Sequence, residues 1–246
     1  MSFFKKLFSS KGADKKYNLT IKPTTDVKAT YEISFKNSKS NEGYFLVIDT
    51  ETTGLPVNSY DKPENLKNWP YIVSIGWLLF DKDGLLISEN YHILKQKNKI
   101  PENSILIHRI TDEIASEIGE DPKGVFEKLS TDEKNSKIII AHNIDFDLPI
   151  IQSEFFRNDL QKPFLAHEKI CTMKSSMSFV GIIGESNKDY FTYKYPKLKE
   201  TFGKCFQETY HFYFDDSLHN SLIDAKTAAL CFFKLFELKV INLSKV

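Results

Sequence analysis

Two acidic residues, Asp49 and Glu51, follow directly on the apolar run 44–48. An apolar run of this length, closed by a turn at Gly54, is typical of a strand that is buried on both faces. Side chains alternate along a strand, so the two carboxylates point to the same side. Neighbouring carboxylates repel each other, so either one of them takes up a proton or a cation lies between them. Hard divalent ions such as Mg²⁺ prefer carboxylate oxygens, and the pair therefore indicates a metal site; solvated acids in a loop are the alternative.

Two further acids lie at the edges of expected core elements. Asp147 follows the apolar stretch 137–141 and precedes a helix that we expect to carry Pro149 in its first turn. Asp224 lies early in a helix that we expect to begin near Ser221. Each acid has a purely structural interpretation, because Asp147 could cap its helix and Ser221 with Asp224 fits a capping box.

His219 lies five residues before Asp224. On one continuous helix this spacing would put the two side chains on different faces, but both can face one cleft if the histidine lies on the loop before the helix. A site for two divalent ions needs about four carboxylates, and the sequence offers them at Asp49, Glu51, Asp147 and Asp224.

The elements that must position these residues can be read from apolar patterns and turn signals. We expect strands at 44–49, 71–80, 85–94, 137–141 and 169–173. The first three predict an antiparallel meander, and the alternation of helices and strands after them predicts an α/β fold with a mixed sheet flanked by helices. Thr111 is the expected N-cap of a helix. We expect a loop over 178–195, whose aromatic residues either stack on bases or cover the core; they are Tyr190, Phe191, Tyr193 and Tyr195.

The chain has 246 residues, enough for one sizeable core and a small appendage. No apolar run approaches the roughly 20 residues that span a bilayer, and the N-terminal residues lack the apolar segment of a signal peptide, so we expect no stable membrane association. Cys171, Cys205 and Cys231 are widely spaced, which argues against disulfides and a zinc knuckle and predicts a cytoplasmic location.

Charge is unevenly distributed although the formal net charge is zero. Residues 1–40 hold nine lysines against three acids, so the remainder carries an equal excess of acids. We interpret 1–40 as a basic extension, either mobile or forming an added hairpin, and 41–246 as the main domain. The extension could contact nucleic acid, an anionic membrane surface or a protein partner.

The order of the motifs resembles that of the DEDDh 3′–5′ exonucleases, a family with an RNase H-like fold that includes the proofreading epsilon subunit of bacterial replicative DNA polymerases. Residues 49–55 match D-x-E-T-T-G-L, residues 142–147 match H-N-x-x-F-D, and residues 219–225 match H-x-x-x-x-D-A. Residues 107–111 are similar to a segment that contains H-G-I-T, with Arg109 in place of the glycine. The resemblance covers residues 44–238 and implies that 41–246 is an exonuclease domain.

The resemblance implies two divalent ions, Mg²⁺ or Mn²⁺, held by Asp49, Glu51, Asp147 and Asp224, with His219 as the general base. It implies release of nucleoside 5′-monophosphates from DNA 3′ ends, in proofreading or repair, with a single-stranded nucleic acid as substrate and a DNA polymerase as a further partner. An RNA-trimming exonuclease of the same fold and a non-catalytic polymerase-tethering module are the alternatives. The residues that position and likeness assign to substrate binding are Thr50, Thr52, Thr53, Leu55, His108 and Asn143.

Overall fold

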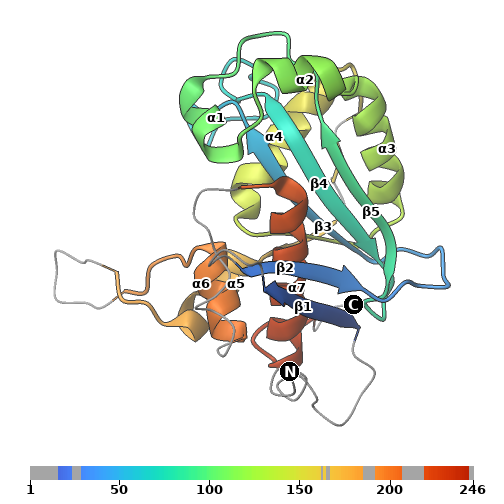
Figure 1. Cartoon of the computed structure of the whole chain (residues 1–246), viewed down its shortest axis with the longest axis vertical. Coiled ribbons are helices and arrows are strands. Elements are labelled where there is room, and N and C mark those ends of the chain that lie inside the picture. The colour runs from blue at the N-terminus through green and yellow to red at the C-terminus, as the bar shows by residue number, and fades with distance from the viewer. Residues whose placement is uncertain are drawn as a thin grey trace.

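A five-stranded mixed sheet forms the centre of the protein (Figure 1). The computed structural model describes residues 16–23, 29–161, 163–164, 167–184, 192–206 and 219–243. The strands lie in the order β5-β4-β3-β6-β7. They are β3 (Phe45–Thr52), β4 (Ile72–Phe80), β5 (Leu86–Ile93), β6 (Ile138–Ala141) and β7 (Glu168–Cys171).

The predicted antiparallel meander is confirmed. β3 pairs antiparallel with β4, and β4 pairs antiparallel with β5. β6 pairs parallel with β3, and β7 pairs parallel with β6. Because the sheet is mixed and is flanked by helices, the α/β fold class expected from the sequence is also confirmed.

Seven helices belong to the described residues. They are α1 (Glu102–His108), α2 (Asp112–Ile118), α3 (Pro122–Lys134), α4 (Ile144–Arg157), α5 (Thr172–Val180), α6 (Leu198–Cys205) and α7 (Ser221–Glu237). Thr111 caps α2 as predicted, since its side chain accepts a hydrogen bond from the Ile114 amide. None of these helices is long and apolar enough to cross a membrane.

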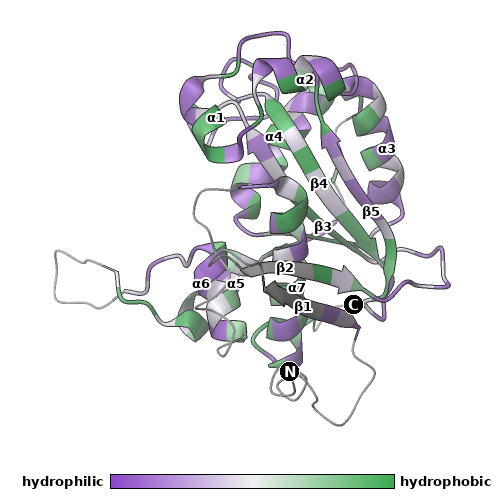
Figure 2. Cartoon of the chain, in the orientation of Figure 1, coloured by the Kyte–Doolittle hydropathy of each residue, from purple (hydrophilic) through white to green (hydrophobic). Residues whose placement is uncertain are grey.

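Each face of the sheet has its own hydrophobic core, because alternate residues of one strand point to opposite faces. Phe45 and Val47 of β3 pack in a cluster with residues of α6 and α7. Leu46 and Ile48 pack in a second cluster with residues of α3 and α4. β3 is therefore buried on both faces, as its continuous apolar run predicted. Figure 2 shows the matching pattern in the helices, where α2 and α3 alternate between hydrophilic and hydrophobic residues.

A separate two-stranded antiparallel sheet lies beside the core. It consists of β1 (Tyr17–Pro23) and β2 (Ala29–Phe35). Ile33 and Phe35 are buried in the same cluster as α7, so β2 is attached to the main body by apolar contacts. Residues 1–15 of the expected basic extension lie outside the described residues, and the division into two domains stays a prediction.

Two helices differ from the sequence-based expectation. α4 begins at Ile144, so Pro149 lies inside the helix and not in its first turn. The helix extends back to this point because Ile144 and Leu148 bury their side chains in the core. α5 occupies residues that we expected to be the end of a strand, at 172–173, and the start of a loop, at 178–180.

The first turn of α7 lies directly against the backbone of β4. A Cβ atom at Gly76 would lie 2.5 Å from the Leu222 amide nitrogen and 2.6 Å from the Leu222 Cα. The Oγ atoms of Ser74 and Ser221 are 3.0 Å apart and hydrogen bond across the same contact. Gly76 is also the residue of β4 that pairs with Asp49. The absence of a side chain at Gly76 thus allows the start of α7 to approach the acidic end of β3.

We expect Gly76→Ala to lower the free energy of unfolding by about 1–3 kcal/mol, since the new methyl group would overlap backbone atoms that cannot move independently. Urea unfolding monitored by circular dichroism measures this change. Gly124→Ala is the matched control, because a Cβ atom there meets nothing within 4 Å. It lies in α3, where alanine is favoured over glycine by up to about 1 kcal/mol, so its stability should stay equal or rise. Equal stabilities for the two variants would contradict the close-approach argument.

Candidate active site

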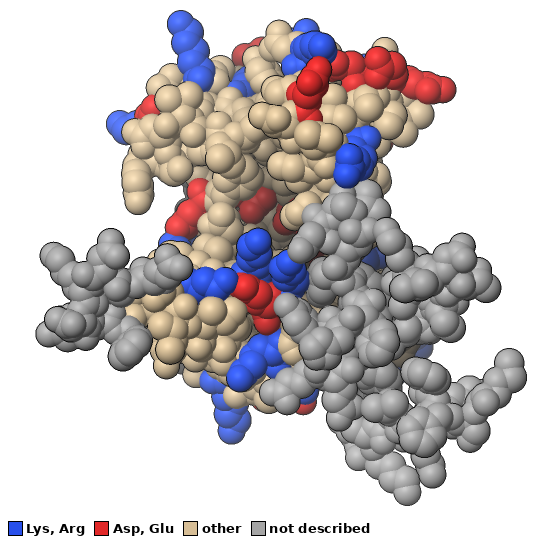
Figure 3. Space-filling view, turned by 60° about the vertical axis from the view of Figure 1, so that its left-hand side comes forward, with Lys and Arg blue, Asp and Glu red and all other residues tan. Residues whose placement is uncertain are grey.

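Four predicted carboxylates converge at the carboxyl end of β3. Asp49 and Glu51 lie on β3, Asp147 lies on α4 and Asp224 lies on α7. Glu51 and Asp147 are buried, with exposed fractions of 8% and 2%, whereas Asp49 and Asp224 are half-buried. Figure 3 shows acidic side chains in a hollow between the two parts of this face of the molecule.

Glu51, Asp224 and His219 form a group that could hold a metal ion. One possible ligand atom from each residue lies within 4.8 Å of those of the other two. The Nδ1 atom of His219 is 3.7 Å from Oδ2 of Asp224. Carboxylate oxygens are the ligands that Mg²⁺ and Mn²⁺ prefer, so the chemistry of the donors fits a hard divalent ion.

The electrostatics of the acids show that all four act on one another. Burial raises the pKa of Asp49 well above its ordinary value, and the charges of Asp147, Asp224 and Glu51 raise it further. Burial also raises the pKa of Glu51 to about 8, with a further contribution from Asp224 that His219 partly opposes. Without a bound cation, the site can keep its acids together only by holding protons on some of them.

Asp147 is fixed by the strand that carries the first two acids. Its Oδ1 atom accepts hydrogen bonds from the Thr50 amide at 3.1 Å and from the Thr50 hydroxyl at 2.8 Å. Burial raises the pKa of Asp147 to about 7, and the two bonds from Thr50 act in the opposite direction. Thr50, a predicted substrate-binding residue, therefore orients a carboxylate in this structure.

The two helix-capping interpretations are wrong. The N-cap residue of α4 is Asn143, so Asp147 lies within the helix and does not cap it. α7 is capped by Asn220, whose Oδ1 atom accepts hydrogen bonds from the amides of Leu222 and Ile223. Asp224 is consequently available to the carboxylate group.

His219 and His108 lie next to each other at the rim of the site. The His219 amide donates a 3.5 Å hydrogen bond to the carbonyl of Ile107, and 54% of the His219 side chain is exposed. His108 is buried, and its Nδ1 atom accepts a hydrogen bond from the Ile110 amide. Burial, followed by the charge of His219, lowers the pKa of His108. Within the described part of the chain, its Nε2 atom has no hydrogen-bond partner.

The turn after the acids is held by its own hydrogen bonds. The Thr52 hydroxyl donates to the carbonyl of Gly54 at 2.7 Å. Thr53 forms two hydrogen bonds with Tyr71, one through its amide and one through its hydroxyl oxygen. Leu55 is 83% exposed next to this turn, which leaves an apolar side chain available to a ligand.

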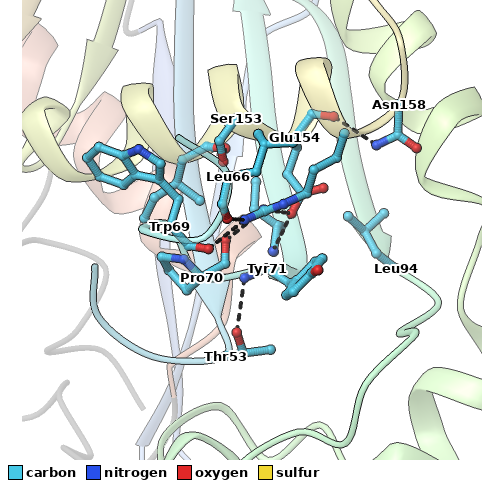
Figure 4. A network of polar contacts seen from close by, with 12 residues as sticks. Thr53, Leu66, Trp69, Pro70, Tyr71, Leu94, Ser153, Glu154 and Asn158 are labelled. Atoms are coloured by element: carbon cyan, nitrogen blue, oxygen red, sulfur yellow. Dashed lines mark hydrogen bonds and ion pairs between the residues drawn. The ribbon is translucent and has the colours of Figure 1, made fainter. Parts of the chain in front are cut away.

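Arg157 anchors the loop that follows the acids, and sequence reasoning missed it. Figure 4 shows Leu66, Trp69, Pro70 and Glu154, which are its partners, close together. Its guanidinium donates to the carbonyls of Leu66, Trp69 and Pro70 at 2.8, 2.5 and 2.9 Å. It also pairs with Glu154 at 2.6 Å, and Glu154 accepts a hydrogen bond from the Ile72 amide. The detectable signal in the sequence was an acid, Glu154, three residues before a base, Arg157, within one helix.

His142, the first residue of the second motif, links two segments on one side of the site. Its Nε2 atom lies 3.0 Å from the carbonyl oxygen of Pro196, and its Nδ1 atom lies 2.9 Å from the hydroxyl of Thr172. Burial lowers the pKa of His142 to about 4, so the imidazole is neutral at pH 7. A neutral ring donates through one nitrogen and accepts through the other, and these two partners satisfy both.

The solved structures similar to this chain include three of exonuclease I. The E. coli enzyme in complex with a dT13 oligonucleotide matches with a TM-score of 0.57 and 15% identity, over 78% of this chain and 40% of that one. The zinc-bound form of the E. coli enzyme with single-stranded DNA gives the same TM-score and identity, over 79% and 40%. A further exonuclease I structure has a TM-score of 0.58 and 14% identity, over 78% and 40%.

At these identities the likeness shows a shared fold, and the chain covers only 40% of the length of exonuclease I. No curated protein sequence matches the chain. The family model RNase_T, described as exonuclease, matches residues 46–232, which include all four acids and His219. With a match over most of its length, the chain belongs to the RNase_T exonuclease family.

Proposed function

We propose that the protein is a metal-dependent 3′–5′ exonuclease that releases nucleoside 5′-monophosphates from single-stranded DNA. Asp49, Glu51, Asp147 and Asp224 would hold two divalent ions, Mg²⁺ or Mn²⁺. The observation that carries the proposal is the convergence of these acids in a partly buried hollow where their charges oppose one another. A family of exonucleases and a fold shared with exonuclease I support it.

Bound divalent ions would supply positive charge that offsets the carboxylates and the scissile phosphate. His219 is exposed and close to Asp224, so its imidazole can reach an attacking water and accept a proton from it. With an ordinary pKa near 6.5, imidazole is suited to this transfer around neutral pH. Asp224 Oδ2 faces the Nδ1 side of the ring at 3.7 Å and would stabilise the protonated form.

Thr53, Leu55, His108 and Asn143 border the site and would contact the terminal nucleotide. The rigid turn at Thr53 and the exposed side chain of Leu55 provide a shaped edge for its base and sugar. Because Nδ1 of His108 accepts from the Ile110 amide, the neutral ring carries its proton on Nε2, which is a buried donor in this structure.

DNA is favoured over RNA by the DNA complexes of exonuclease I, whose fold this chain shares. An RNA-trimming enzyme of the same fold is the second candidate, and comparison of matched DNA and RNA oligonucleotides separates the two. A role in proofreading or repair, with a DNA polymerase as partner, rests on the sequence resemblance. A non-catalytic tethering module would not require all four acids and the histidine.

We expect His219→Ala to lower the rate of hydrolysis of a 5′-labelled single-stranded DNA by at least about 100-fold, because the general base is lost. Magnesium binding, measured by isothermal titration calorimetry, should persist because the four acids remain. Asp49→Asn should lose both activity and magnesium binding. Wild-type hydrolysis by the His219 variant would show that another group is the base. Unchanged magnesium binding by the Asp49 variant would exclude the proposed metal site.

We expect the metal-free protein to lose stability as the pH rises from about 5 to about 8. In the folded state the pKa of Glu51 is about 8 and that of Asp147 is about 7, above the ordinary values near 4. The folded protein therefore keeps protons that the unfolded chain releases, and their loss on raising the pH opposes folding. Thermal melts in EDTA at pH 5.5 and 8 measure this effect.

Adding Mg²⁺ should raise the melting temperature more at pH 8 than at pH 5.5, because the ion and the protons compete for the same oxygens. Glu51→Gln should flatten the pH dependence in EDTA. Glu127→Gln, an exposed position on α3, should leave it unchanged. A melting temperature in EDTA that rises between pH 5.5 and 8 would contradict the assigned repulsion.

A further inference from the structure

A short segment around Pro196 is fixed to the wall of the candidate active site. Its carbonyl oxygen accepts the hydrogen bond from His142, which directly precedes the N-cap residue of α4, the helix that carries Asp147. Pro196 is buried, whereas its neighbours Tyr195 and Lys197 are exposed. The anchor thus holds exposed side chains at a fixed place close to the carboxylates.

The preceding residues are held in an extended conformation. Tyr193 forms an antiparallel bridge with Ile183, and the Lys194 amide donates to the carbonyl of Ile182 at 2.9 Å. Tyr193 is 47% exposed and Tyr195 is 57% exposed. The sequence left open whether these aromatics cover the core or stack on bases, and the described pair does not cover the core. Tyr190 and Phe191 lie outside the described residues.

A cavity of about 590 Å³ lies beside the second motif. Its lining includes Asn143 at the start of α4, Lys169 at β7 and Lys174 on α5, with Tyr60 of the loop after the first acids. The His142 ring contacts both Thr172, the first residue of α5, and Pro196, so the helix that carries Lys174 and the segment that carries Tyr195 meet at the second motif. The exposed tyrosines and the lysine-lined cavity therefore both lie next to the second motif, at the start of the helix that carries Asp147.

The lysines on this surface form only weak ion pairs with their present partners. Lys174 pairs with Asp145, and Lys194 pairs with Glu200 at 2.7 Å. The side chains of Lys174 and Asp145 are 46% and 63% exposed. Exposed ion pairs contribute at most about 1 kcal/mol, so a phosphate can replace the carboxylate partner. Lys197, the N-cap residue of α6, is exposed at the same edge.

Exposed aromatic rings interleaved with lysines are the combination that binds single-stranded nucleic acid. Bases stack on aromatic rings irrespective of sequence, and lysines contact the backbone phosphates. The acidic hollow alone would repel a polyanion. Figure 3 shows lysine and arginine side chains gathered directly beside the hollow, where they offset that repulsion.

We propose that one surface of the protein, here called the Tyr–Lys surface, binds the nucleotides upstream of the 3′-terminal nucleotide of a single strand. The Tyr–Lys surface consists of Tyr193, Tyr195, Lys174 and Lys197. The inference rests on the proposed function, since it assumes that the 3′ end lies at the carboxylates. In this proposal the Tyr–Lys surface gives the protein its preference for long strands over short ones, and the carboxylate site carries out the hydrolysis.

The test measures binding of a 12-nucleotide and a 2-nucleotide DNA by fluorescence anisotropy, with Mg²⁺ and in a His219→Ala background that keeps the DNA intact. Tyr193→Ala/Tyr195→Ala should weaken binding of the 12-mer at least tenfold and reduce its advantage over the 2-mer. Lys174→Gln/Lys197→Gln should also weaken the 12-mer and make the dependence of log K on log salt less steep by about 1.4, or about 0.7 per lost phosphate contact. Thermal melts check that each variant is folded.

Lys123→Gln/Lys134→Gln is the matched control, because it removes the same charge from α3, which packs on the other face of the sheet. It should change the affinity for the 12-mer less than twofold. Wild-type affinity and salt dependence in both surface variants would overturn the proposal, even if the wild-type protein hydrolyses DNA. A protein that does not hydrolyse DNA but loses 12-mer binding in the surface variants would instead overturn the proposed function and retain the surface.

Discussion

The contact between the first turn of α7 and the backbone of β4 is the constraint on which the candidate site depends. β3 supplies two acids and α4 a third, but Asp224 and His219 reach them only because α7 begins against the sheet. Gly76 makes that approach possible, and the hydrogen bond between Ser74 and Ser221 fixes it. Asn220 supplies the cap, so Asp224 is not required to complete the helix and can face the other acids. Capping of the helix and the placement of a site residue are thus carried out by different residues, Asn220 and Asp224.

The site concentrates like charges in a place that solvent reaches poorly. Burial is the largest contribution to the raised pKa values of Asp49, Glu51 and Asp147, and mutual repulsion adds to it for each of them. Such an arrangement opposes folding of the metal-free protein, and the surrounding structure must hold it in place. Two apolar clusters bury β3 on both faces, and Thr50 ties α4 to the same strand. Strongly perturbed acids that converge in a hollow are typical of functional sites, whereas scattered surface acids rarely show such shifts.

The sequence predicted most of the features that depend on patterns of neighbouring residues, which are the strands, their order and the motifs. The apolar run before Asp49 predicted a strand buried on both faces, and the apolar patterns at 71–80 and 85–94 predicted two neighbouring strands, which pair antiparallel as β4 and β5. Three motifs predicted which acids belong together. The contribution of Gly76 could not be predicted, because it arises from contact with Leu222, far along the chain. Arg157 was missed because its pairing with Glu154 gives only a local signal, whereas the carbonyls of the distant loop that it binds carry no residue-type signal. Pro149 was misplaced because proline favours the first turn, and here burial of Ile144 and Leu148 extended the helix beyond that preference.

The distribution of charge on this face is the one that the proposed polyanionic substrate would require. The carboxylates that we propose to hold divalent ions would repel phosphates until those ions were bound, so their confinement to a small hollow would limit that repulsion. Cations within the hollow would compete with the ions for the carboxylates, and the lysines lie on neighbouring elements instead, at Lys169, Lys174 and Lys197. His142 joins the two regions through Pro196 while remaining neutral, so it adds no charge that would disturb either of them. In the proposed function, a neutral linker between an acidic centre and a basic border would allow both to act on one strand, at consecutive nucleotides, without forming ion pairs with each other.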